Sequence, residues 1–203
     1  MPDRRRSVDR RNLLRLSAAL PVAVVLSAWG AHVSAAQELA PTPACGHGEE
    51  PTPRQMEGPF FKPRSPRRTS LFDAGVRGTQ CVVSGLVLST ACQPVPGALL
   101  DFWQCDDAGN YDNSGYRLRG HQFTDDAGRY RLETIVPGLY PGRTRHIHVK
   151  VQAPGRPLLT TQLYFPNEPA NRDDFLFRPE LLLSISDSGG AQAGRFDFVV
   201  TLG

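Results

Sequence analysis

The sequence predicts an all-β protein that folds as a single β-sandwich domain, and two features of its pattern support this. From residue 81 onward, short runs of apolar or alternating residues recur, and turn-forming residues separate them. No long stretch has the 3.6-residue period of an amphipathic helix. The expected strands are Cys81–Leu88, Ala98–Gln104, Arg129–Thr134, His146–Gln152, Leu158–Phe165 and Phe196–Thr201. Regular short strands of this kind are typical of two packed sheets.

Turn signals separate most of these strands. Asn, Asp, Gly and Pro favour tight turns because they adopt or fix the backbone angles that turns require. They cluster at residues 93–97, 107–110, 125–128, 137–138 and 154–155. The segment Pro179–Ile185 fits either a short helix or a further strand.

The first 35 residues have the three-part plan of a secretory signal. Six arginines precede an apolar run from Leu16 to Trp29, and small residues follow at positions 34–36. The pair Arg10-Arg11 suggests the twin-arginine route. A membrane anchor is the alternative, but the run of about 14 residues is shorter than the roughly 20 that cross a bilayer. We therefore expect residues 1–35 to be an export signal, and the mature protein to be periplasmic or extracellular without a stable membrane anchor.

The composition after the signal predicts a linker and then one folded domain. Residues 36–56 are rich in Pro, Ala, Glu and Thr and lack a hydrophobic period, which favours a flexible linker before a domain at residues 57–203. Loss of residues 1–35 would remove six Arg and two Asp and change the net charge from +3 to about −1. A near-neutral domain lacks the basic face that nucleic-acid binding needs, so no nucleic-acid partner is expected.

Four cysteines could form two disulfides in an exported chain, and their pairing is not readable from the sequence. They are Cys45, Cys81, Cys92 and Cys105. None has the C-x₂-C spacing of a zinc site. Because Cys92 and Cys105 flank the apolar segment around residues 98–103, they are our first expectation for one bridge. Buried free thiols are the alternative.

The run His146-Ile147-His148-Val149-Lys150-Val151 is the most informative expected strand. Alternation places His146, His148 and Lys150 on one face and the apolar residues between them on the other. Two imidazoles that project the same way from a strand can bind one metal ion. The pair alone does not select the metal, because His-x-His occurs in several classes of metalloprotein, and a solvated polar face is the alternative.

Two tyrosines lie on expected loops close to this strand. Tyr140 is in the turn Pro137-Gly138-Leu139-Tyr140-Pro141, directly upstream of the histidines, and Tyr111 follows the strand that ends at Trp103-Gln104. Tyr116 could replace Tyr111 if the loop folds differently. Tyr130 and Tyr164 fall inside strand patterns, where tyrosines usually pack.

These motifs, in this order, resemble the intradiol ring-cleavage dioxygenases, the family of protocatechuate and catechol dioxygenases. In that family, a strand ending in Trp-Gln and followed by Gly-x-Tyr supplies one tyrosine ligand. Pro-Gly-x-Tyr-Pro supplies a second, and Arg-x-x-His-Ile-His supplies an arginine and two histidines. The matching residues here are 103–111, 137–141 and 143–148, and the resemblance runs from about Glu57 to Asn167.

The resemblance implies a non-heme Fe(III) ion held by Tyr111, Tyr140, His146 and His148. Phenolates are hard anionic donors that favour ferric iron, and a trivalent cation readily removes the tyrosine proton. It also implies intradiol cleavage of a catechol-like diol by O₂, giving a muconate-type dicarboxylic acid. By analogy, Tyr111 and His146 are equatorial, and Tyr140 and His148 are axial. Tyr140 is then displaced by the substrate and accepts its proton.

Two further residues gain roles from the same resemblance. Arg143 matches an arginine that stabilises negative charge developing on the substrate ring; a surface salt bridge is the alternative. Gln162 matches a glutamine near the active site, and alternation places it on the same face as Tyr164; plain strand packing is the alternative. His121 could line the pocket, although surface exposure is the simpler interpretation.

The sequence also departs from the better-known members of the family. Only Pro141 and Gly142 separate Tyr140 from Arg143, where those members have a longer insertion, so one pocket wall is expected to be trimmed. The N-terminal part is too short for the helical dimerisation segment of catechol-type enzymes, so that dimer is not expected, although another oligomer is left open. The competing functions are a non-catalytic binding module and a zinc hydrolase, which would need a third ligand and a general base.

Overall fold

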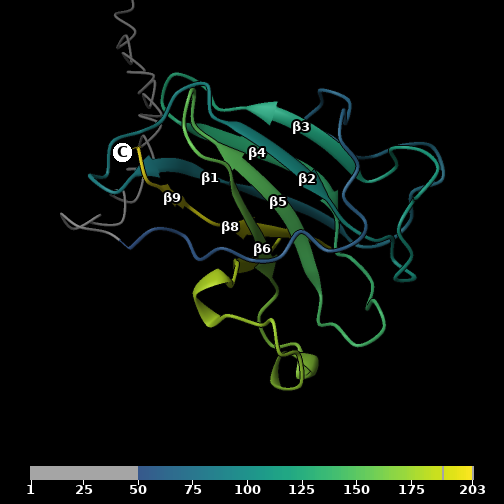
Figure 1. The fold of residues 1–203 in the computed structure, drawn as a ribbon. Helices are drawn as coiled ribbons and strands as arrows, with labels where there is room; N and C mark the ends of the chain where they lie inside the picture. Colours follow the sequence, from purple (N-terminus) through teal and green to yellow (C-terminus); the bar gives the residue numbers. More distant parts are fainter. Residues whose placement is uncertain (1–49, 189, 203) are drawn as a thin grey trace, which may run out of the picture. The chain divides into compact units, whose positions relative to one another are not determined.

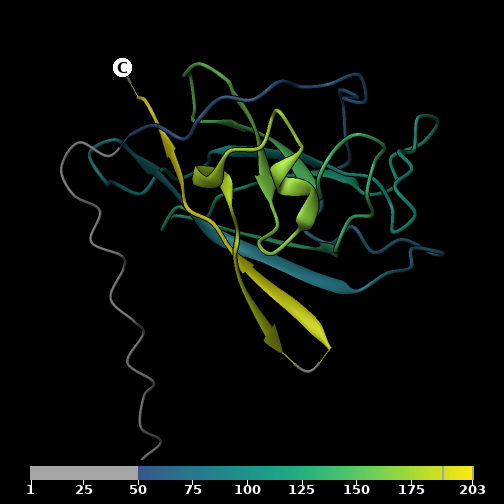
Figure 2. The ribbon, with the colours of Figure 1, turned by 90° about the horizontal axis from the view of Figure 1, so that it is seen from below.

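The computed structural model describes residues 50–188 and 190–202, which form two packed β-sheets (Figures 1 and 2). One sheet has the strand order β4-β1-β8-β7, with β9 also paired to β1, and the other has the order β3-β2-β5-β6. The strands are β1 Gln80–Ser89, β2 Leu99–Trp103, β3 Arg119–Phe123, β4 Arg129–Ile135, β5 His146–Gln152, β6 Leu159–Tyr164, β7 Ser184–Ser188, β8 Ala191–Arg195 and β9 Phe198–Val200. The predicted all-β sandwich is confirmed.

Three strands were not expected from the sequence. They are β3, β7 and β8, and each has few large apolar residues. Figure 2 shows β7 and β8 as a hairpin that extends away from the rest of the sandwich. The segment Pro179–Ile185 is neither a single helix nor a single strand, because the 3-10 turn η2 (Pro179–Leu181) ends before β7 begins at Ser184.

The expected export signal lies outside the described residues, as does most of the expected linker. The described part of that linker is bonded to the domain: the Thr52 N–H donates to the Val199 carbonyl at 2.9 Å, and Thr52 is buried. The packed domain therefore begins before Glu57, the expected boundary. In the part of the chain that the structure covers, no helix is long and apolar enough to cross a bilayer.

The hydrophobic core fills the space between the two sheets, and β5 shows how the sequence pattern builds it. Ile147, Val149 and Val151 are fully buried on the inner face of β5, where Val149 pairs with Phe102 of β2. Burial of each such side chain contributes about 1.5–3 kcal/mol. Because the apolar positions of β5 face this core, its histidines and Lys150 must lie on the opposite face, as predicted.

A row of polar and aromatic side chains crosses that opposite face. Strand register aligns Arg119 of β3, Trp103 of β2, His148 of β5 and Gln162 of β6. Residues 53–68 run across this face (Figure 1). Their contacts with the strands include Gln55 N–H to Thr160 O at 2.8 Å, His121 N–H to Pro66 O at 2.9 Å and an ion pair between Glu57 and Lys150. Both faces of this sheet are therefore covered, which leaves His146 and His148 only 2% exposed.

The cysteines do not pair as first expected. Cys105 is a buried free thiol, and so is Cys81, so a bridge between Cys92 and Cys105 does not form and that expectation was wrong. The Cys105 thiol instead lies 3.4 Å from the Gly138 carbonyl oxygen, inside the structure that supports the two tyrosine loops.

Candidate metal centre

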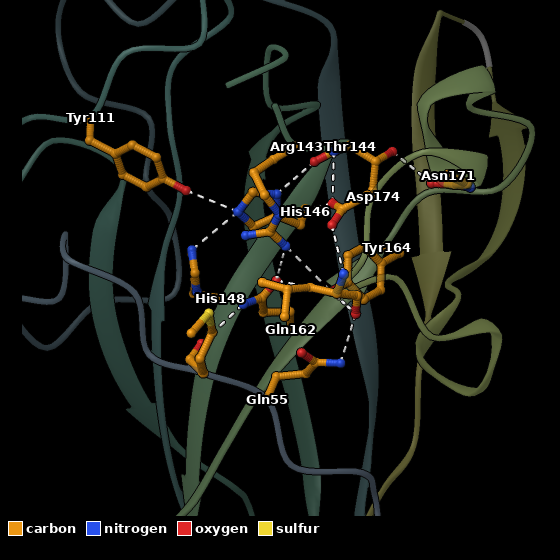
Figure 3. Close-up of polar contacts among 12 residues, drawn as sticks. Gln55, Tyr111, Arg143, Thr144, His146, His148, Gln162, Tyr164, Asn171 and Asp174 are labelled. Atoms are coloured by element: carbon orange, nitrogen blue, oxygen red, sulfur yellow. Dashed lines mark hydrogen bonds and ion pairs between the residues drawn. The ribbon is translucent and has the colours of Figure 1, made fainter. Parts of the chain in front are cut away.

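Three side chains from two elements bring their donor atoms to one point. The Tyr111 hydroxyl lies 3.2 Å from Nε2 of His146, which lies 3.1 Å from Nε2 of His148 (Figure 3). Two donors that share a metal at about 2.1 Å each and at about a right angle are about 3 Å apart. Nε2 of His146 therefore has the spacing of a neighbouring metal ligand both to the Tyr111 oxygen and to Nε2 of His148.

The hydrogen bonds of the two imidazoles leave nitrogen lone pairs for such an ion. Nδ1 of His146 lies 2.6 Å from the Thr144 carbonyl oxygen, which only accepts, so we assign the proton to Nδ1 and the lone pair to Nε2. His148 stacks on Trp103 with ring centroids 4.7 Å apart, and among the described residues its Nδ1 has no partner. Burial lowers the pKa of His146 to about 4 and that of His148 well below its ordinary value, so both rings are neutral at pH 7.

Tyr111 is held by a ring stack. The Phe60 ring lies parallel to the Tyr111 ring, with centroids 4.3 Å apart. Burial raises the pKa of the Tyr111 phenol, while the charges of Arg143 and Arg119 oppose that rise. A bound cation would therefore be needed to keep Tyr111 as a phenolate at neutral pH.

Tyr140 joins the same cluster but is held less tightly. Its ring centroid is 5.8 Å from that of Tyr111 and 5.3 Å from that of Phe60. The side chain is half-buried, and its hydroxyl has no hydrogen-bond partner within the described residues. The structure thus brings together all four residues expected to bind metal, with Tyr140 the least constrained of them.

Two glycines allow the tyrosine loops to meet. The Gly138 N–H donates to the Asp106 carbonyl at 2.8 Å, and a Cβ on Gly138 would lie 2.4 Å from the amide nitrogen of Gly109. No side chain fits between main chains at that distance. The Gly-x-Tyr and Pro-Gly-x-Tyr motifs therefore need glycine for close packing of the loops, which places the two tyrosine rings side by side.

Arg143 is bonded within the site and is not part of a surface salt bridge. Its Nη2 donates to Oε1 of Gln162 at 2.7 Å and its Nε donates to Oδ2 of Asp174 at 2.9 Å (Figure 3). Gln162 is fully buried and also donates to the Met56 carbonyl, so it does more than pack in its strand. The Tyr164 hydroxyl joins the same network, 2.8 Å from the Leu176 carbonyl oxygen.

Sequence reasoning missed two charged residues around the site. Arg119 is 1% exposed and donates to the main-chain carbonyls of Phe60, at 2.6 Å, and Asp112, at 3.0 Å from Nη2. It thereby fixes both the loop of Tyr111 and the ring that stacks on it. The signal was its position on the same sheet face as the histidines, on β3, a strand that was not recognised. The second residue, Asp174, lies in a polar loop without periodicity and gave no signal.

Other candidates lie apart from the cluster. The Tyr116 hydroxyl donates to the Pro63 carbonyl at 3.0 Å, so it does not replace Tyr111. His121 is half-buried on β3 with Nδ1 2.8 Å from the Ser65 carbonyl oxygen, one pleat row away from His148. In residues 50–188 and 190–202, no group of three or more His, Cys, Asp or Glu could hold a metal. Among these residues, the Tyr111 oxygen is the donor that the structure places at 3.2 Å from the histidine pair.

Comparisons with known proteins identify the family and the fold. A family model described as Dioxygenase matches residues 56–201. The fold is similar to the dioxygenase domain of a dioxygenase carbohydrate-binding protein fusion from the cellulolytic bacterium Streptomyces sp. SirexAA-E, with 59% identity and a TM-score of 0.74, over 76% of this chain and 100% of that one.

Curated relatives are dioxygenases too, and the match covers a smaller share of their length. The chain is 30% identical over 153 residues to catechol 1,2-dioxygenase of Pseudomonas sp. (strain EST1001) and 33% identical over 154 residues to hydroxyquinol 1,2-dioxygenase of Rhodococcus opacus. These matches cover 62% and 64% of this chain and 51% of each relative, so the chain spans about half the length of the curated relatives it matches. Together, the family match and these relatives show that the chain belongs to the intradiol dioxygenase family.

Proposed function

We propose that this protein is a non-heme ferric dioxygenase that cleaves a catechol-type diol between its two hydroxyl-bearing carbons. The observation that carries the proposal is the convergence of the Tyr111 oxygen and both histidine Nε2 atoms at 3.1–3.2 Å, with the Tyr140 ring beside them. Both atoms of O₂ enter the product, a muconate-type dicarboxylic acid, so the reaction needs no external reductant. The names of the catechol and hydroxyquinol 1,2-dioxygenase relatives support this substrate class.

The donor set supports ferric iron. Two phenolate oxygens and two neutral imidazoles suit a hard trivalent ion, and Tyr111, Tyr140, His146 and His148 would hold it. When bound, the iron supplies a site that takes the diol as a dianion and makes its ring electron-rich toward O₂. Burial raises the pKa of the Tyr111 phenol, so the iron, when bound, would supply the positive charge that removes the phenol proton at neutral pH.

The protein's own groups divide the remaining tasks. Tyr140 is half-buried and its hydroxyl has no hydrogen-bond partner in the described part, so it would be the ligand best able to move and to accept a proton from the diol. Arg143 places a fixed positive charge beside the site, where it stabilises negative charge that develops on the ring. Gln162 holds that guanidinium through its Oε1 atom.

The short connection after Tyr140 supports a site that is open on one side. Only two residues separate Tyr140 from Arg143, and the neighbouring Leu139 side chain is 49% exposed. Ring substituents on the substrate can therefore extend toward solvent past this turn. A panel of catechol, protocatechuate and hydroxyquinol measures which substituents are accepted.

The test uses purified, iron-loaded protein. We expect a visible tyrosinate-to-iron absorption band, diol-dependent oxygen uptake, and a dicarboxylic acid product that contains both atoms of ¹⁸O₂. Tyr140→Phe should shift the band and slow oxygen uptake, whereas Tyr116→Phe, which removes a hydroxyl that bonds only Pro63, should change neither. A colourless protein with stoichiometric zinc and no oxygen uptake would overturn the proposal. An unchanged Tyr140→Phe variant would overturn the role of Tyr140.

We also propose that the protein is exported through the twin-arginine route, with residues 1–35 as the signal. The support is the six arginines ahead of an apolar run and the pair Arg10-Arg11. Fractionation of cells should place the mature protein outside the cytoplasm, with a mass that lacks the signal. Arg10→Lys together with Arg11→Lys should retain the uncleaved precursor inside the cell, and unaltered export of that variant would contradict the route.

A further inference from the structure

A short 3-10 turn faces the chain that leads into the histidine strand. The turn η1 (Pro169–Arg172) follows Glu168, and side chains three residues apart in a 3-10 helix lie on the same side. Glu168 precedes this turn, Asn171 lies in it and Asp174 follows it, and the three residues are spaced three apart. They accept hydrogen bonds from three consecutive residues, in reverse order along the chain. Arg145 Nε donates to Glu168 Oε1 at 2.7 Å, and Thr144 Oγ1 donates to Asn171 Oδ1 at 2.6 Å. Arg143 Nε donates to Asp174 Oδ2 at 2.9 Å.

Asp174 is the most buried acid of this row, and three donors satisfy it. Its side chain is 1% exposed. Oδ2 accepts from Arg143 Nε and from the Thr144 N–H, both at 2.9 Å, and Oδ1 accepts from the Leu176 N–H at 2.9 Å. A buried carboxylate with these partners is fixed in position, because rotation of the group would break three charge-assisted hydrogen bonds.

The same oxygen of Asp174 reaches two parts of the site. It bonds the guanidinium of Arg143 directly, and it bonds the amide of Thr144, whose carbonyl oxygen lies 2.6 Å from Nδ1 of His146 (Figure 3). The orientation of an imidazole that binds metal is set by the partner of its other nitrogen. The path from Asp174 through Thr144 therefore ends at the ring that would bind the metal.

We propose that Asp174 is a positioning residue that sets the Arg143 guanidinium and the His146 imidazole relative to each other. This inference rests on the proposed function, since it names what holds the charge and one ligand of that site. Arginine has many rotamers, and its charge assists a transition state only when it is already in place. Asp174 accepts a hydrogen bond from Nε of Arg143, and Gln162 accepts one from Nη2. Nη1 of Arg143 has no hydrogen-bond partner among the described residues.

Asp174→Asn tests the proposal, with Asp173→Asn as its control. Both variants remove one negative charge from adjacent positions, but Asp173 is exposed and its side chain makes no hydrogen bond within the described part of the chain. We expect Asp174→Asn to lower kcat by about 10- to 100-fold, with a smaller change in KM, because Arg143 acts in the transition state. It should also weaken iron retention against a chelator and shift the visible band. Asp173→Asn should match the wild type in all of these measurements.

A double-mutant cycle separates the two paths. If Asp174 lowers the barrier through Arg143, then Asp174→Asn should cost no further kcat in an Arg143→Met background. The loss of iron retention should persist in that background, because it runs through Thr144 and His146. Full additivity of the two kcat losses would contradict the path through Arg143.

A second variant covers the case in which Asp174→Asn folds poorly. Asn171→Ala leaves Asp174 in place and removes the hydrogen bonds of the Asn171 side chain to the Thr144 hydroxyl and the Phe165 carbonyl, so it should weaken iron retention and leave the kcat of iron-loaded protein unchanged. An equal loss of kcat in Asn171→Ala would overturn the division of roles. Thermal unfolding of the metal-free variants reports their folding independently of iron.

The outcomes for Asp174 and for the proposed function are distinguishable. If the wild-type protein takes up no oxygen with any diol, the proposed function fails, while iron retention and the visible band still report on Asp174. If the wild type is active and Asp174→Asn equals Asp173→Asn in kcat, iron retention and spectrum, the positioning role is overturned.

Discussion

Gly109 lies directly against the carbonyl of Leu139, so closely that a Cβ on Gly109 would lie 2.3 Å from the Leu139 oxygen. Gly109 is two residues before Tyr111, and Leu139 is one residue before Tyr140. The distance between the two tyrosine rings therefore depends on a contact between main chains, which any side chain at position 109 would disrupt.

Gly109→Ala should separate the two tyrosine loops. The backbone at Gly109 has φ +85°, whereas Gly155 has φ +68° and a Cβ there would meet nothing within 4 Å. Gly155→Ala should therefore lower the free energy of unfolding by about 1–2 kcal/mol, through the strain of a positive φ alone. Gly109→Ala adds a steric clash and should lower it by about 3 kcal/mol or more in total. Denaturant unfolding of metal-free protein measures the difference, and only Gly109→Ala should alter the visible band. Equal effects of the two variants would show that the close contact is unimportant.

Replacement of Arg119 should destabilise the fold although the change is conservative. Lysine cannot reproduce the guanidinium fork that bonds the Phe60 and Asp112 carbonyls together, and it would leave one of these half-buried carbonyls unpaired. We expect Arg119→Lys to lower the free energy of unfolding by about 2–3 kcal/mol. The control is Arg131→Lys, at an exposed pair with Glu133, which should stay within about 0.5 kcal/mol of the wild type.

The free thiols of Cys81 and Cys105 should not react with thiol reagents in the folded protein. Burial raises the pKa of Cys81 to about 11, and burial together with the nearby Asp106 raises the pKa of Cys105 to about 11. At pH 8 only about one thiol in a thousand would then be ionised, and neither is accessible to a reagent. A thiol-reactive dye should label both only when denaturant unfolds the protein. Rapid labelling of either one in native buffer would contradict their burial.

Acid should remove the stability that Asp174 provides. Burial alone would raise the pKa of Asp174, but hydrogen bonds from Thr144, Leu176 and Arg143 outweigh it and lower the pKa. A carboxyl with a lowered folded pKa stabilises the fold above its unfolded pKa, near 4, and loses that contribution as pH falls through the folded value. The difference in unfolding free energy between metal-free wild type and Asp174→Asn should therefore shrink as pH falls below about 4. A difference that stays constant from pH 7 to pH 3 would contradict the ionised state of Asp174.

The sequence was most informative where local chemistry dictates structure. Alternation at residues 146–151 placed the histidines opposite the core, because a strand that packs one face must present the other. The tyrosine motifs indicated which loops would meet, since their prolines and glycines restrict the chain. Strands β3 and β8 escaped notice because they contain few apolar residues and exist through pairing with β2 and β1.

The supporting residues could not be found in the same way. Arg119 bonds the main-chain carbonyl of Phe60, 59 residues away, and Asp174 bonds Arg143, 31 residues away. Neither partner has a sequence signature, because a carbonyl occurs at every position and a lone Arg–Asp pair has no fixed spacing. The bridge expected between Cys92 and Cys105 failed for a related reason: proximity to one strand in sequence does not bring two thiols within bonding distance.

The hydrogen bonds of Glu168, Asn171 and Asp174 constrain the number of residues in this segment of the chain. Each residue in a 3-10 helix turns the chain by about 120°, so one deletion within Pro169–Arg172 would redirect the chain that follows and move Asp174 away from Arg143, while every amino acid of the strands stays unchanged. Substitutions on the outer side of this turn, as at Arg172, should be tolerated during evolution. Insertions and deletions within it should be purged, and a length alignment of related chains would show the turn as a gap-free block between more variable loops.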